Sequence, residues 1–173
     1  MASEARLRMT PREERPVTLV DSSVILDIVT EDPAWSDWSS TALAQAADDG
    51  QLVINPIVYA EVSTGFSRIE DLDDAVPVSD FGREQLPYEA GFLAGKAFLA
   101  YRRQGGQRRS PLPDFYIGAH AAVRGYRLLT RDIARYRTYF PTVQLIAPEP
   151  ESRSSSLSLG GVLGAADGGQ EAV

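Results

Sequence analysis

The sequence predicts an α/β domain built on a parallel sheet with helices on both faces. Short runs rich in valine, isoleucine and leucine alternate with longer segments of helical period, which is typical of βαβ units. The first run, Val17–Val20, leads directly into Asp21, and a short apolar run with a polar stop fits a buried strand of a parallel sheet. With 173 residues, the chain is long enough for one domain with its own core.

Capping residues predict where the helices of the first half of the chain begin and end. Ser22 or Ser23 can cap a short helix. Gly50 stands at the C′ position of the next helix, and Asn55-Pro56 supplies an N-cap and a first-turn proline for the third. The predicted elements here are strand 17–21, helix 22–29, helix 35–49, strand 51–54 and helix 56–66.

The second half is ordered mainly by proline and glycine. Pro87 and Pro113 open two helices, and Gly125 follows the second. The segment 71–81 is ambiguous, and we expect a short acidic helix followed by an extended stretch at 76–78. The remaining predicted elements are helix 88–103, helix 113–124, strand 127–130, helix 133–140 and strand 142–146.

The chain divides into a charged flexible leader (1–16), one domain (17–147) and a Gly/Ser-rich tail (148–173). The tail has few large apolar residues, so burial cannot offset the entropy of ordering it, and we expect disorder. The leader has no apolar stretch typical of a signal peptide, and no apolar run approaches the roughly 18 residues that span a bilayer. We therefore expect a cytoplasmic protein that does not enter a membrane.

Composition removes several kinds of chemistry. The chain has no cysteine, so disulfides, thiolate metal sites and a cysteine nucleophile are excluded. A single histidine disfavours a two-histidine nuclease, and His120 lies on a different helix face from Asp114, which favours a packing or surface role. The net charge of −7 is the wrong sign for a general nucleic-acid binder, but arginines gather between residues 102 and 137.

Four acidic residues occupy positions that favour a shared site. Asp21 and Asp132 follow predicted parallel strands, whose carboxyl ends form the usual ligand edge of such sheets. Asp114 opens a helix, and Glu61 shares a helix face with Ile57 and Val58. Each also has a structural alternative: an ion pair between Glu61 and an arginine, a dipole interaction for Asp114, and a helix cap for Asp132.

If these acids converge, they require a cation at neutral pH, because like charges in one pocket repel each other. Oxygen ligands without cysteine or histidine suit a hard ion, Mg²⁺ or also Mn²⁺. Such an ion can activate water and offset charge on a phosphoryl transition state. The acids therefore predict metal-dependent hydrolysis of a phosphate ester.

Four segments together resemble the acidic motifs of PIN domains, and most of all those of VapC-type toxins of bacterial toxin–antitoxin pairs. The resemblance covers about 17–147 and is carried by Leu19–Ser23, Tyr59–Glu61, Pro113–Ala121 and Leu128–Asp132. It implies a three-layer α/β/α sandwich with a short parallel sheet, Mg²⁺-dependent endoribonuclease activity that leaves 5′-phosphate and 3′-hydroxyl ends, an antitoxin partner and a homodimer. The residues that it implies are Asp21, Glu61, Asp114 and Asp132 as catalytic metal ligands, with Ser22 and Thr130 as supporting hydroxyls.

Four arginines are candidates for contact with RNA. They flank Gly105-Gly106 just before the Asp114 helix, where they could grip phosphates or form a solvated helix end and loop. They are Arg102, Arg103, Arg108 and Arg109.

Two other functions remain open at this point. One is a non-catalytic PIN-like module that binds RNA or a protein. The other is a phosphatase with Asp21 as nucleophile, against which stands Ser23 at the position where common phosphatases of that design carry a second aspartate.

Overall fold

The computed structural model describes residues 15–149 and contains one sheet of five parallel strands. The sheet order is β3-β2-β1-β4-β5, so the first strand is central and both of its neighbours come from later in the chain. The strands are β1 (Val17–Val20), β2 (Gln51–Ile54), β3 (Phe81–Arg83), β4 (Arg127–Leu129) and β5 (Leu145–Ile146).

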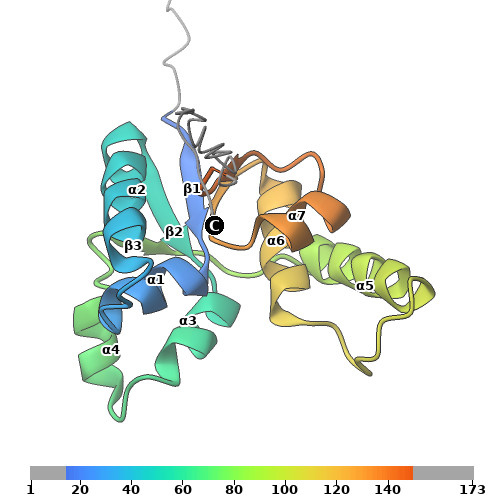
Figure 1. The fold of residues 1–173 in the computed structure, drawn as a ribbon, viewed down its shortest axis with the longest axis horizontal. Coiled ribbons are helices and arrows are strands. Elements are labelled where there is room, and N and C mark those ends of the chain that lie inside the picture. The colour runs from blue at the N-terminus through green and yellow to red at the C-terminus, as the bar shows by residue number, and fades with distance from the viewer. Residues whose placement is uncertain (1–14, 150–173) are drawn as a thin grey trace, which may run out of the picture.

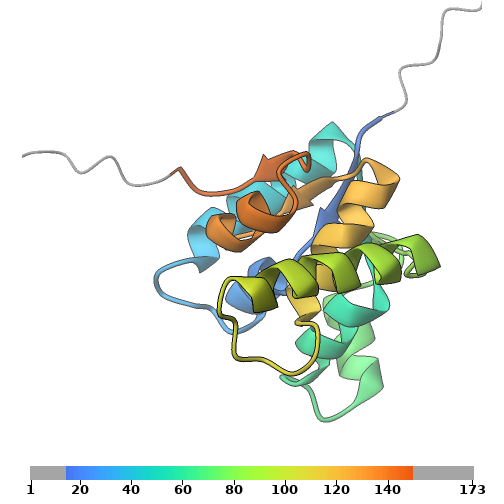
Figure 2. The same cartoon turned by 90° about the vertical axis from the view of Figure 1, so that its right-hand side faces the viewer.

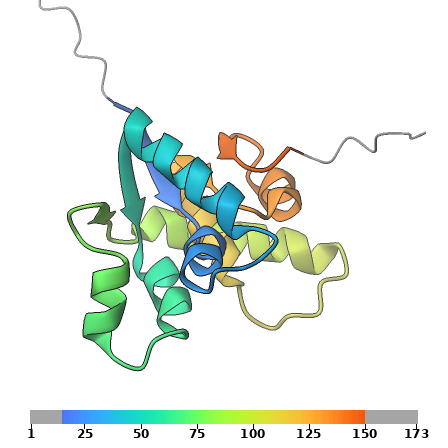
Figure 3. The same cartoon turned by 60° about the vertical axis from the view of Figure 1, so that its left-hand side comes forward.

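Helices cover both faces of this sheet, which confirms the predicted three-layer α/β/α architecture (Figure 1). Helices α1 and α2 cover one face, and α6 and α7 cover the other, with α5 packed along the outer side of α6 (Figure 2). Helices α3 and α4 lie beyond the carboxyl ends of the strands (Figure 3). The helices are α1 (Ser22–Val29), α2 (Ser36–Asp49), α3 (Pro56–Ser63), α4 (Ile69–Ala75), α5 (Tyr88–Arg103), α6 (Pro113–Arg124) and α7 (Ile133–Tyr139).

The capping signals of α3 and α6 act as predicted. The Asn55 side chain accepts hydrogen bonds from the backbone N–H groups of Ile57 and Val58, both at 3.0 Å, and Pro56 occupies the first turn. Gly125 follows α6 with a left-handed φ of 68°, a conformation that glycine adopts without a steric cost. These two caps fix where the helices that carry Glu61 and Asp114 begin or end.

The segment after α4 differs from the prediction. Residues 76–78 are not a strand: the chain turns there, with the N–H groups of Asp80 and Phe81 both donating to the Pro77 carbonyl. The strand lies further on, at Phe81–Arg83, paired with β2 at the edge of the sheet. Because this strand is three residues long and contains Gly82, it carries almost no apolar periodicity.

Two local predictions near the first strands are also wrong. Neither Ser22 nor Ser23 caps α1, because Asp21 is the N-cap residue and α1 begins at Ser22. Gly50 does not adopt a left-handed conformation; its φ is −171°. A Cβ at Gly50 would instead overlap the carbonyl oxygen of Pro16, so close approach of the segment before β1 requires glycine there. Helix α3 and strand β5 are shorter than predicted.

The core places the end of β1 at the centre of the domain. Leu19 and Val20 are fully buried between the helical layers. On the other side of the sheet, α6 and α7 pack closely, since a Cβ at Gly118 would overlap the ring of Phe140. The carboxyl end of β1 therefore lies between α1 and the N-terminus of α6 (Figure 1).

The predicted leader and tail lie outside the described residues, apart from 15–16 and 148–149. Among the helices of residues 15–149, none is long and apolar enough to cross a membrane.

Candidate functional site

Asp21 is a buried carboxylate at the carboxyl end of the central strand. Its side chain is held through Oδ2, which accepts hydrogen bonds from the hydroxyls of Thr130 (2.7 Å) and Ser23 (2.8 Å). Its other oxygen, Oδ1, is buried and has no hydrogen-bond partner among the residues that the structure describes. The residue is thus oriented through one oxygen, while the other is a buried acceptor without a hydrogen bond of ordinary geometry among these residues.

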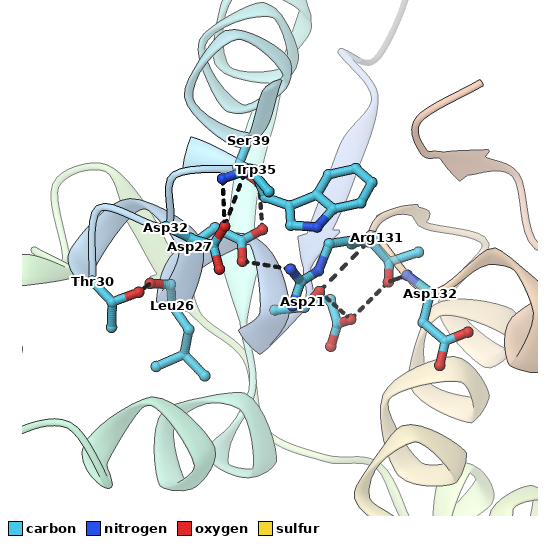
Figure 4. Close-up of polar contacts among 12 residues, drawn as sticks. Asp21, Leu26, Asp27, Thr30, Asp32, Trp35, Ser39, Arg131 and Asp132 are labelled. Carbon is cyan, nitrogen blue, oxygen red and sulfur yellow. Dashed lines mark hydrogen bonds and ion pairs between the residues drawn. The ribbon is translucent and has the colours of Figure 1, made fainter. Parts of the chain in front are cut away.

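Backbone N–H groups of the loop after β4 donate hydrogen bonds to the two hydroxyls that bind Asp21. The backbone N–H of Asp132 donates to the Thr130 hydroxyl (3.1 Å), and that of Arg131 donates to the Ser23 hydroxyl (3.5 Å). Figure 4 shows Asp21 facing this loop. Because β1 and β4 are neighbours in the sheet, residues more than a hundred positions apart meet here.

Asp21, Asp114 and Asp132 line one pocket of about 470 Å³. Asp114 lies in the first turn of α6, and Asp132 caps α7 by accepting from the Arg135 backbone N–H (3.3 Å). The predicted dipole position of Asp114 and cap role of Asp132 therefore coexist with their place in the pocket. The full lining is Asp21, Ser22, Ser23, Trp35, Asp114, Arg131 and Asp132.

Glu61 joins the site from α3 through Ser22. The Ser22 hydroxyl donates to Glu61 Oε2 at 2.8 Å, and no ion pair of Glu61 with an arginine occurs within residues 15–149. Partial burial raises the pKa of Glu61; the Ser22 hydrogen bond lowers it, and the negative charge of Asp21 raises it further. The two carboxylates are thus electrostatically coupled.

Tyr136 lies beneath the site and is a residue that the sequence reasoning missed. It is fully buried, and its hydroxyl has no hydrogen bond of ordinary geometry within the described part of the chain. Burial, followed by the negative charges of Asp21, Glu61 and Asp132, raises its pKa well above 10. The charges of Asp21, Glu61 and Asp132 therefore all act on this one phenol.

Two arginines near the pocket form ion pairs with different acids. Arg135 forms ion pairs with Asp114 and with Asp132, the latter at 3.6 Å. Arg131 lines the pocket but pairs with Asp27 at 3.0 Å. The candidate arginines Arg102, Arg103, Arg108 and Arg109 do not line the pocket; they lie at the end of α5 and in the loop before α6.

The donor set fits a hard divalent ion. The pocket offers carboxylate and hydroxyl oxygens, and the unpartnered Oδ1 of Asp21 is a buried acceptor. Between residues 15 and 149, no group of three acidic side chains is close enough to hold one ion together. A metal ion in this pocket would therefore have at most two carboxylate ligands from these residues in this arrangement.

Two other features carry no comparable chemistry. A larger, mainly apolar hollow of about 550 Å³ lies between α2 and the β2–β3 edge, and Asp80 contributes the one carboxylate of its lining. His120 is fully buried and accepts a hydrogen bond from the Asn55 side-chain amide (3.1 Å), which confirms the predicted packing role.

Comparison with known proteins identifies the family. The model of the PIN domain matches residues 18–141, most of the chain. The protein belongs to the PIN domain family. None of the curated proteins compared with the chain matches it.

Solved structures share the fold at low sequence identity. VapBC2 from Rickettsia felis, bound to a DNA fragment from the promoter, matches with a TM-score of 0.60 and 17% identity over 77% of this chain and 99% of that chain. VapBC-1 from nontypeable Haemophilus influenzae matches with a TM-score of 0.58 and 17% identity over 76% of this chain and 97% of that chain. FitAcB from Neisseria gonorrhoeae matches with a TM-score of 0.55 and 16% identity over 74% of this chain and 95% of that chain. The PIN domain is therefore similar to these structures in fold.

The burial of Asp21 predicts a pH-dependent stability. Burial raises its pKa above the ordinary 3.8, so the metal-free folded state binds this proton more tightly than the unfolded chain. The free energy of unfolding should therefore fall as the pH rises above 3.8 toward neutral. Asp21→Asn should remove part of this fall and raise the stability at pH 7, in EDTA, by about 1 kcal/mol or roughly 4 °C. Thermal unfolding of both proteins across this pH range tests it; an unchanged pH profile would contradict it.

The ion pairs of Arg135 predict competition with a metal. Arg135→Gln should tighten binding of Mn²⁺ by roughly fivefold, because a part-exposed ion pair is worth up to about 1 kcal/mol. Arg137→Gln is the matched control, since Arg137 is exposed on the same helix and does not line the pocket. Isothermal titration calorimetry measures both, and equal affinities for the two variants would exclude competition by Arg135.

Proposed function

We propose that this PIN domain is a Mg²⁺-dependent endoribonuclease and the toxin of a toxin–antitoxin pair. The observation that carries the nuclease proposal is the buried carboxylate of Asp21, which lines one pocket with Asp114 and Asp132 and whose Oδ1 has no hydrogen bond of ordinary geometry within residues 15–149. The membership of the PIN family supports it, and so does the fold shared with the VapBC structures, in keeping with a VapC-type toxin.

The roles that we propose for the chain's own residues follow from their contacts. Thr130 and Ser23 orient Asp21, and Ser22 orients Glu61. Asp114 and Asp132 present oxygens to the same pocket from two helix starts. A divalent ion held by one or two of these carboxylates, together with waters, would supply an activated water and offset charge on the scissile phosphate.

The pocket is suited to a phosphodiester only while its negative charge is compensated. Three aspartates line it, and phosphate groups would be repelled by them without a cation. This is the physical reason why we propose that hydrolysis depends on Mg²⁺, with Mn²⁺ as an alternative ion.

A non-catalytic PIN-like module that binds RNA or a protein is the second candidate. It is favoured by the Arg135 ion pairs, which neutralise Asp114 and Asp132 without a metal. This candidate predicts that neither EDTA nor loss of an acid changes the effect of the protein in cells.

Substitution of the acids separates the two candidates. Asp21→Asn or Asp114→Asn should lower the rate of Mg²⁺-dependent cleavage of RNA by more than about 100-fold, because ligands matter at least as much as the groups that orient them. Asp71→Asn is the matched control, since Asp71 is an exposed acid on α4. Cleavage is measured on total RNA with Mg²⁺ and with EDTA. Full activity in either pocket variant would refute the nuclease assignment.

The toxin proposal has a separate test in cells. Expression of the chain alone should stop growth, and co-expression with its neighbouring reading frame, the candidate antitoxin, should restore it. Asp114→Asn expressed alone should permit growth. Growth curves of the three strains measure this, and growth arrest that persists with the neighbour present would count against an antitoxin encoded there. A homodimer remains part of the same proposal.

A further inference from the structure

Trp35 and Arg131 line the acidic pocket, and the proposed reaction gives neither a role. Trp35 precedes α2, and Arg131 stands between Thr130 and Asp132 in the loop after β4. The guanidinium carbon of Arg131 lies 5.4 Å from the centroid of a Trp35 ring, within the range of a cation–π contact. Figure 4 shows the two side chains together on the same side of Asp21.

Arg131 is fixed by a buried network. Its Nη1 lies 3.0 Å from Oδ1 of Asp27, which is only 3% exposed. The other oxygen of Asp27 accepts a hydrogen bond from Ser39 (2.8 Å), which is fully buried. A buried carboxylate that is itself held in place therefore anchors the guanidinium through one of its nitrogens (Figure 4).

Trp35, the aromatic partner of Arg131, is also held in place by its neighbours. The backbone N–H of Trp35 donates to Asp32 Oδ1 (3.0 Å), and its ring packs edge-on against Trp38 with centroids 6.3 Å apart. Trp35 therefore offers Arg131 a fixed surface rather than a mobile one.

The ion pair with Asp27 involves only one of the guanidinium nitrogens of Arg131. A guanidinium has five N–H donors, and a third of this side chain remains exposed at the pocket. The partners of Arg135 are the candidate metal ligands Asp114 and Asp132, so a metal would compete with it. The partner of Arg131 is not one of the four acids, so Arg131 keeps its place when they bind an ion.

We propose that Arg131 binds the RNA strand at a phosphate next to the one that is cleaved, and that Asp27 and Trp35 position it. This inference rests on the proposed ribonuclease function. A strand entering a pocket lined by three aspartates needs a fixed positive group beside them, and a guanidinium matches a phosphate with two parallel hydrogen bonds. Arg131 is thus a substrate-binding residue, and Asp27 and Trp35 are positioning residues.

The test measures binding of a short single-stranded RNA to protein that carries Asp21→Asn, so that the RNA survives. Because Arg131→Met alone would leave Asp27 without its counter-ion, Asp27→Asn is compared with Asp27→Asn/Arg131→Met. Addition of Arg131→Met should weaken binding about tenfold, the equivalent of one charge-assisted hydrogen bond. It should also reduce the slope of log affinity against log salt by about 0.7, the value for one phosphate contact on a single strand.

Matched controls separate this contact from general charge and from stability. Arg137→Met in the Asp27→Asn protein removes the same charge from an exposed position on α7 and should leave both the affinity and the salt slope unchanged. With Asp27 intact, Trp35→Ala should weaken RNA binding and Trp35→Phe should retain it, because only the latter keeps an aromatic surface under the guanidinium. Thermal unfolding verifies that each variant is folded.

Three outcomes decide between the proposals. If folded Asp27→Asn/Arg131→Met binds RNA with the affinity and slope of the Arg137→Met control, Arg131 serves only as the counter-ion of Asp27 and the inference is overturned. If the wild-type protein does not cleave RNA but Arg131→Met still weakens binding, the nuclease proposal fails while the Arg131 contact stands. If the Asp21→Asn protein binds no RNA, the Arg131 inference is overturned, and cleavage of RNA by the wild-type protein decides the nuclease proposal separately.

Discussion

The site depends on a single buried carboxylate, that of Asp21, whose two oxygens have different hydrogen-bonding surroundings. Oδ2 of Asp21 accepts two hydroxyl hydrogen bonds, whereas Oδ1 is buried without a partner in the described part of the chain. Burial of a charge without full compensation is unfavourable, and here it raises the pKa of Asp21. The surrounding structure therefore keeps Asp21 in a state that a bound cation would stabilise.

The charges around Asp21 form two groups with different partners. Arg135 pairs with Asp114 and Asp132, which line the pocket, and Arg131 pairs with Asp27, which is buried and does not line it. Arg135 thus limits repulsion between Asp114 and Asp132, while Arg131 stays at the pocket through a partner that is not one of the four acids.

Much of the fold and of the site could be predicted from local signals. The strand that ends at Asp21, the Asn55-Pro56 helix start and the Gly125 helix end are each encoded within a few residues. The order of the acidic motifs then predicted which elements meet. The edge strand Phe81–Arg83 could not be predicted in this way, because it is defined by backbone pairing with β2 and not by an apolar pattern of its own. Tyr136, Trp35 and Arg131 were missed for a related reason: only the tertiary packing of α7, α2 and the β4 loop brings them to the site.

The sheet order has a consequence for the protein during its synthesis. The hydrogen bond from Thr130 to Asp21 joins residues 109 positions apart, and β4 is the neighbour that completes the pairing of β1. Contacts of such long range form only after the intervening chain exists and its closure entropy has been overcome. A growing chain on the ribosome consequently lacks an oriented Asp21 until β4 has emerged, so the acidic pocket can be assembled only after most of the domain has been made.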